Sequence, residues 1–252
     1  MIDELRTFLE SFQDSEGKFV SGNYVKSTSE FLLVHRLCPG IGVGDAGRAR
    51  TYLLKNVPCF AFLEVTQGFR QMERIWQIAV GIPEDTSFLS GKFLELCFSG
   101  VSASVKSALL LVLFLQNVDA ETSLDTALRE VVNYQENLLK TVSLDSLYET
   151  THNLLTFYMA KQKYDVDDII FRCCEWLSQT VFLYGNCIDL LAETVSVTYL
   201  CGYEDGNSRK IISLLQETQN TDGGLPIFAG EKSEFHPSLV GLWGLTASGI
   251  RV

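Results

Sequence analysis

The chain has 252 residues, of which 46% are hydrophobic and 20% are charged, and its formal net charge at pH 7 is −11. This composition is typical of a globular protein with a substantial core. The acidic balance leaves no basic surface to neutralise phosphates, so it argues against nucleic acid or an anionic membrane surface as a partner.

Apolar residues recur mainly at spacings of three and four, beginning with LRTFLESF at residues 5–12 and continuing through IIFRCCEWLSQTVFL at 169–183. Because alternating strand patterns are missing, we predict an all-α fold. The opening segment MIDELRTFLE lacks the basic start of a secretory signal, and the longest apolar run, Ala108 to Leu115, is too short to span a bilayer. Seven cysteines without a CxxC pair indicate buried thiols. We therefore expect a cytoplasmic protein without membrane insertion.

Two distant segments share one helical unit. Aligning SFQDSEGKFV at residues 11–20 with ETQNTDGGLP at 217–226 pairs Gln13 with Gln219 and Gly17 with Gly223, 206 residues apart. The same offset places Glu30 on His236. The pattern predicts that each unit consists of a helix, an acidic turn with glycine, a short connecting segment and a second, more apolar helix.

Further copies lie between these two segments. HNLLTFYMA and ETVSVTYLC align His152 with Glu193, and THNLL and FHPSL align His152 with His236. The spacing is about 42 residues, which corresponds to two helices with their turns and to about six units in the chain. Other units are expected near Lys106 and, with a weaker match, near Gly68. The match between repeats is weakest in residues 40–100, where PGIGVGDAG is interpreted as a turn.

The first and last units resemble each other more than either resembles the middle ones, as expected if the two ends of the chain meet. An open solenoid would instead have atypical polar ends. We therefore predict a single domain over residues 1–252, an (α/α)6 toroid of six inner and six outer helices.

The unit Q…DGG…FH…LVGLWGL resembles the repeat of protein prenyltransferase β-subunits and terpene cyclases, and this resemblance implies an α/α barrel. LYETTHNLLTFY at 147–158, DLLAETVSVTYL at 189–200 and the segment 214–245 are similar to an uncharacterised bacterial family, domain of unknown function 6895. That family implies no specific activity. Fold analogy favours a tailoring or cyclising step in specialised metabolism.

Two family motifs depart from their patterns here. The prenyltransferase zinc site pairs an Asp and a Cys with a later His; His236 matches, but Leu191 and Glu193 occupy the other positions. Zinc-dependent prenylation is therefore not supported, whereas an altered metal site is. Asp165, Asp167 and Asp168 match the DxDD motif of class II cyclases. In this repeat register they begin an outer helix, so we favour a capping role.

Equivalent positions of neighbouring repeats should meet at one mouth of a toroid, where the inner helices begin. Pro237 suits the first position of the last helix, which places His236 on or beside its N-cap. The predicted ring contains Glu30, Lys106, His152, Glu193 and His236.

His152, Glu193 and His236 form a set with two histidines and one carboxylate. Such a set suits Zn²⁺ or non-haem Fe²⁺ when coordination positions must stay open for water or substrate. Glu149 and Asp189 share helix faces with His152 and Glu193, so they could orient the imidazoles as outer acceptors. Without a metal, the same residues could act as a general acid and base. Alternatively, each is a cap or a hydrogen-bonded pair that fixes packing.

We therefore predict an enzyme that acts on an apolar or amphipathic small molecule or peptide by acid/base or metal-assisted chemistry. The alternative is a non-catalytic scaffold that holds a peptide or a carrier protein at the toroid mouth.

Overall fold

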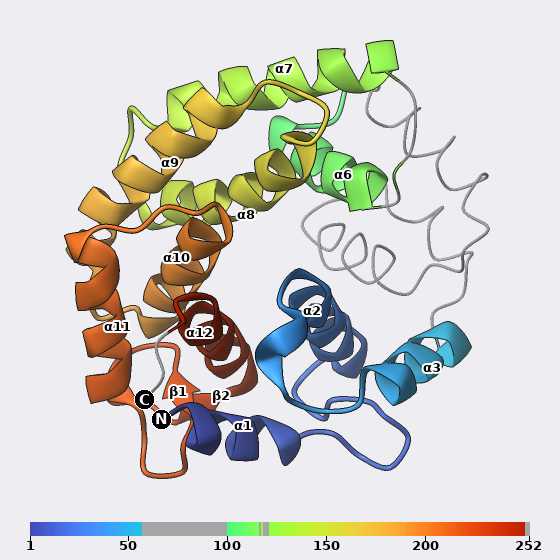
Figure 1. Cartoon of the computed structure of the whole chain (residues 1–252), viewed down its shortest axis with the longest axis vertical. Helices are drawn as coiled ribbons and strands as arrows, with labels where there is room; N and C mark the ends of the chain where they lie inside the picture. Colours follow the sequence, from blue (N-terminus) through green and yellow to red (C-terminus); the bar gives the residue numbers. More distant parts are fainter. Residues whose placement is uncertain (57–99, 116, 118–120, 250–252) are drawn as a thin grey trace. The chain divides into compact units, whose positions relative to one another are not determined.

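The computed structural model describes residues 1–56, 100–115, 117 and 121–249. Over these residues the secondary structure consists of ten α-helices, two short 3₁₀ helices and one two-stranded sheet, which confirms the all-α prediction (Figure 1). Among these helices none combines the length and hydropathy that a bilayer crossing requires. None of the described cysteines takes part in a disulfide. The helix expected near Gly68, together with Cys59 and Cys97, lies outside the described residues.

The chain forms two compact units, and the first of them joins both ends of the chain, residues 1–57 and 177–252. Its elements are α1 (Ile2–Glu10), α2 (Tyr24–Leu37), η1 (Pro39–Ile41), α3 (Ala46–Asn56), η3 (Val181–Tyr184), α10 (Ile188–Leu200), α11 (Gly206–Thr218), β1 (Leu225–Pro226), β2 (Ser233–Glu234) and α12 (Phe235–Ala247).

Helices of two kinds alternate in this unit. α10 and α12 are buried along almost their whole length, whereas α1 buries Leu5 and Leu9 and α11 buries a single stripe that includes Ile211 and Leu215. Burial on one stripe is typical of a helix that covers a core from outside, and burial on all sides is typical of a helix within it. The predicted alternation of apolar and amphipathic helices is therefore present here.

The two turns aligned in the sequence have the same hydrogen bonds. Gln13 Nε2 donates to the carbonyl of Gly17 at 3.1 Å, and Gln219 Nε2 donates to the carbonyl of Gly223 at 2.7 Å. Both glycines have a positive φ, +95° and +88°, which side chains other than glycine rarely adopt. The repeat predicted from residues 206 apart is therefore a repeat of backbone structure.

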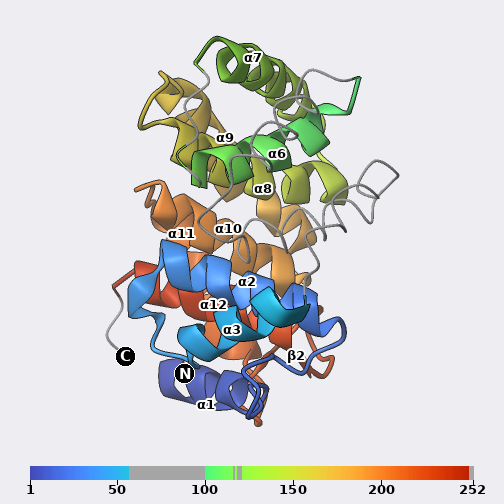
Figure 2. The ribbon, with the colours of Figure 1, turned by 90° about the vertical axis from the view of Figure 1, so that its right-hand side faces the viewer.

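The glutamine of each turn also binds the backbone at the start of an outer helix. Gln13 Nε2 also donates to the carbonyl of Asp45, just before α3, and Gln219 Nε2 donates to the carbonyl of Met1, just before α1. The turn at residues 219–223, near the end of the chain, thus holds the start of its first helix. α1 packs against α12, and α12 also packs against α2, so the first and last helical pairs meet as predicted (Figures 1 and 2).

Close packing of α10 against α12 sets the spacing at the site described below. A Cβ on Gly244 would come within 2.6 Å of Val195 Cγ1 and 2.9 Å of Ser196 Oγ. Ser196 Oγ also donates to the carbonyl of Val240 at 2.6 Å. The small residue on α12 and the hydrogen bond from α10 therefore bring the two helix backbones close together.

The second unit spans residues 58–176. Its described elements are α6 (Ala103–Leu115), α7 (Glu121–Leu138), α8 (Leu144–Ala160) and most of α9 (Asp167–Thr180). Buried amides join α7 to α8, because Gln135 Nε2 donates to Thr150 Oγ1 and Asn153 Nδ2 donates to Gln135 Oε1, both at 2.8 Å. These satisfied polar groups hold the two helices in register.

The acidic DVDD segment lies where the sequence predicted it, at the start of a helix. α9 begins at Asp167, and Asp165, Asp167 and Asp168 are exposed. Asp168 also pairs with Arg172 one turn later, at 2.9 Å. These contacts agree with the predicted role of the acids at a helix N-terminus.

The predicted positions of the ring residues within their helices are partly wrong. Lys106 is the fourth residue of α6, Glu193 the sixth of α10, Glu30 the seventh of α2 and His152 the ninth of α8. Aligning repeats shows which side chains occupy equivalent faces of their helices. It does not locate the ends of the helices, which depend on the caps. Glu30, His152 and Glu193 lie beyond the first turn and so are not caps.

His236 is also not an N-cap, because α12 begins at Phe235 and its N-cap is Glu234. Pro237 is therefore the third helical residue and not the first. The first four N–H groups of a helix have no partner within the helix, so proline is tolerated there as well.

Candidate metal centre

Three residues of the first unit form the candidate site. Asp189 and Glu193 lie one turn apart on the same face of α10, and His236 lies in the first turn of α12 beside it. The start of α10 is anchored because the N–H groups of Ile188 and Asp189 donate to the carbonyl of Ile227, at 2.8 and 3.3 Å. The positions of both acids are therefore determined by a helix with a fixed end.

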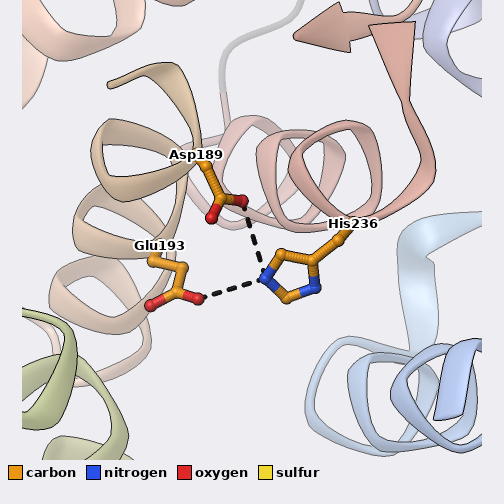
Figure 3. Close-up of side chains that lie close together, drawn as sticks. All are labelled: Asp189, Glu193 and His236. Carbon is orange, nitrogen blue, oxygen red and sulfur yellow. Dashed lines mark hydrogen bonds and ion pairs between the residues drawn. The ribbon is translucent and has the colours of Figure 1, made fainter. Parts of the chain in front are cut away.

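The two carboxylates face the same nitrogen of the imidazole (Figure 3). His236 Nε2 lies 3.1 Å from Glu193 Oε1 and 3.6 Å from Asp189 Oδ1. All three ligand atoms lie within 4.8 Å of one another. Ligands about 2.0–2.2 Å from one metal ion lie roughly 3.0–3.4 Å apart, so these donors need only small shifts to share an ion.

A third carboxylate lies on the opposite side of the ring. Glu30 Oε2 of α2 is 3.3 Å from His236 Nδ1, and the other oxygen of Glu30 is 3.7 Å from Lys26 Nζ. The three acidic side chains are only 9–13% exposed, whereas the His236 side chain is 34% exposed. The imidazole is thus in contact with solvent and the acids are largely covered.

The charges of this cluster determine its protonation. Burial by itself would lower the pKa of His236, but the charges of Glu30 and Asp189 and the hydrogen bond with Glu193 raise that pKa well above its usual value. Burial would likewise raise the pKa of Glu30, and the charge of His236 lowers it instead. Without a metal, the surrounding carboxylates therefore favour the charged form of the imidazole.

Repeat register correctly predicted which residues would be neighbours in this unit. Glu30, Glu193 and His236 were aligned at equivalent positions, and the contacts of His236 with both acids confirm that they are close together. Asp189 was predicted to stand behind an imidazole as an outer acceptor. It lies instead beside Glu193 in front of Nε2, because residues four apart on a helix share a face.

The remaining predicted site residues belong to the second unit. His152 is half-buried on α8. Glu149 accepts a hydrogen bond from Tyr134 Oη, and Lys106 pairs with Glu130. The predicted metal set of His152, Glu193 and His236 is thus divided between the two units, and the participation of His152 stays a prediction.

No protein-family model matches the chain, and neither does any curated protein or solved structure. The resemblances named from the sequence therefore remain predictions, and the geometry of the site is the basis for a function.

Proposed function

We propose that this protein is an enzyme that holds a divalent cation between Asp189, Glu193 and His236 and acts on an apolar or amphipathic small molecule. The observation that carries the proposal is the convergence of both carboxylates on Nε2, at 3.1 and 3.6 Å. A proton on that nitrogen can be donated fully to one carboxylate only, whereas a cation can bind all three groups. The donor set suits Zn²⁺ or Fe²⁺.

Three protein ligands leave coordination positions for water or substrate, which is the arrangement of catalytic rather than structural metal sites. A cation bound in this way supplies a Lewis acid or lowers the pKa of a bound water. The residues of the chain have defined roles: Asp189 and Glu193 neutralise the cation, and His236 provides the nitrogen ligand. We favour metal-assisted chemistry over acid/base chemistry in which His236 acts without a metal. The reason is again that two carboxylates face one ring nitrogen.

Apolar side chains beside the site support an apolar or amphipathic ligand. Ile227 and Phe228 are 37% and 38% exposed, and the carbonyl of Ile227 accepts the hydrogen bond from the N–H of Asp189. Exposed apolar groups next to a polar cluster are typical of ligand sites. The acidic cluster also makes a strongly anionic substrate unfavourable.

The scaffold that we propose for this enzyme is the closed α/α toroid. The contact between the first and last helical pairs and the alternation of fully and partly buried helices support it. The exposed side chains of Ile227 and Phe228 are also compatible with the second candidate function, a non-catalytic scaffold for a peptide or a carrier protein.

Metal titration of the purified chain tests the proposed function. We expect Zn²⁺ to bind to the wild type at one site, and Glu193→Gln to weaken this binding more than 100-fold, since loss of a ligand exceeds the roughly 10–100-fold effect of an outer partner. Binding should become tighter as the pH rises, because the proton on His236 must leave before Nε2 can bind an ion. Isothermal titration calorimetry measures both effects.

The control is Glu217→Gln, which removes an exposed carboxylate from α11 and should leave Zn²⁺ binding unchanged. Circular dichroism shows whether each variant is folded. If the wild type binds neither Zn²⁺ nor Fe²⁺, or if Glu193→Gln binds as tightly as the wild type, the metal centre is disproved and the scaffold function is favoured.

A further inference from the structure

We propose that Glu30 is the positioning residue of this site: it accepts the proton on Nδ1 of His236 and so keeps Nε2 available for the cation. The proposal rests on the function proposed above and adds a residue from the first helical pair to a site otherwise built from the last two. The contact that carries it joins Glu30 Oε2 and His236 Nδ1 at 3.3 Å.

The chemistry follows from the two nitrogens of imidazole. A neutral imidazole carries one proton, and the hydrogen bond made by one nitrogen determines which of the two is protonated. On the Nε2 side, Glu193 and Asp189 both attract that proton. On the Nδ1 side, Glu30 is the competing acceptor. Without it, the proton would stay on Nε2, between the two carboxylates, at the position where the cation must bind.

Packing next to both residues holds this contact in place. Phe31 follows Glu30 and Phe235 precedes His236, and Phe19 packs between their rings at centroid distances of 4.4 and 5.3 Å. All three rings are almost fully buried. Because the aromatic stack fixes α2 against the start of α12, it also fixes the carboxylate of Glu30 relative to the imidazole.

Lys26 holds the other end of the carboxylate. Its Nζ is 3.7 Å from Glu30 Oε1, so one oxygen of Glu30 faces the lysine and the other faces the imidazole. A metal-bound histidine commonly donates its second N–H to a carboxylate, which orients the ring and raises its basicity, and Glu30 Oε2 lies on the Nδ1 side where such an acceptor is needed.

Two variants separate positioning from packing. Glu30→Met keeps much of the volume but removes the acceptor, and Glu30→Gln removes the charge but keeps an oxygen that can accept the Nδ1 proton. We expect Glu30→Met to weaken Zn²⁺ binding about 10–100-fold and Glu30→Gln to restore most of the loss. Calorimetry measures the affinities, and Glu10→Gln, an exposed carboxylate at the end of α1, is the matched control.

The second readout is the tautomer of His236 in the metal-free protein, at a pH above the titration of the imidazole. Nitrogen-15 NMR should show a larger share of the Nδ1–H tautomer in the wild type and in Glu30→Gln than in Glu30→Met, where only the carboxylates on the Nε2 side attract the proton. The proposal is overturned if Glu30→Met has the same share of the Nδ1–H tautomer as the wild type, or if both variants weaken binding equally without a change in that share. In that case Glu193→Gln still tests the metal centre by itself, and the tautomer is informative even if no metal binds.

Discussion

Replacing His236 with alanine is expected to destabilise the metal-free protein by about 2–3 kcal/mol at pH 6. The substitution leaves Glu30, Asp189 and Glu193 without the positive charge that faces all three of them. Removing one partner of a buried ion pair costs roughly 3–5 kcal/mol, and the smaller figure allows for the 34% exposure of the imidazole. Urea unfolding in the presence of a chelator measures the difference.

This loss of stability should depend on pH. The pKa of His236 is raised above 6.5 in the folded state, so its stabilisation is complete below that pH and disappears as the pH rises through the folded pKa. The pKa of Glu30 is lowered below 4.5, so its stabilisation is present above that pH and disappears under stronger acid. The difference between wild type and variant should therefore be largest between pH 4.5 and 6.5.

His35→Ala is the control for this comparison, because His35 packs against Phe31 on the same helix α2 and is separate from the cluster. Unfolding of both variants is measured at pH 5.5 and in an alkaline buffer, and His35→Ala removes a ring contact of α2 while the ion pairs of His236 stay in place. An equal loss of stability at both pH values for His236→Ala would contradict the assignment of a charged imidazole.

Substituting alanine for Gly223 is expected to cost about 3 kcal/mol, whereas the same change at Gly230 should cost about 1 kcal/mol. The two glycines have almost the same φ, +88° and +87°, which costs an L residue roughly 1–2 kcal/mol. They differ in their surroundings. A Cβ on Gly223 would come within 2.7 Å of the carbonyl oxygen of Glu4 in α1, and a Cβ on Gly230 meets nothing within 4 Å.

Overpacking against backbone adds about 1–3 kcal/mol, and α1 must shift to relieve it. Because α1 packs on α12, we also expect faster hydrogen exchange in residues 2–10 of Gly223→Ala than of Gly230→Ala. Urea unfolding gives the free energies, and mass spectrometry gives the exchange. Equal effects of the two substitutions would show that the close approach of the last turn to α1 contributes nothing.

A substantial part of the fold was predictable from local pattern. Spacings of three and four identified helices, and the paired Gln and Gly residues identified a turn that recurs with the same hydrogen bonds. The boundaries of the helices were less predictable, as the start of α12 at Phe235 shows. A cap is chosen by one or two hydrogen bonds, so a single proline is a weak signal for a helix start.

The candidate site was predictable in part, because Glu193 and His236 belong to the predicted metal set, whereas Asp189 was assigned an outer role. Offsets between repeats brought Glu30, Glu193 and His236 together correctly, because repeated units place equivalent positions side by side. The spacing of Asp189 and Glu193 by four residues was also visible in the sequence. It showed that they share a helix face, but it did not show which ring nitrogen they would face.

By itself, the sequence determined the helical class, the repeated turn and the register that aligns Glu30, Glu193 and His236. Only the tertiary structure decided that Asp189 and Glu193 lie on the Nε2 side of His236 and Glu30 on the Nδ1 side. The physical reason is that repeat register specifies the position of a residue along its helix. Which carboxylate each ring nitrogen faces depends on how closely the helices approach one another. That approach is set by contacts such as those of Gly244 with Val195 and Ser196, between residues distant in the chain.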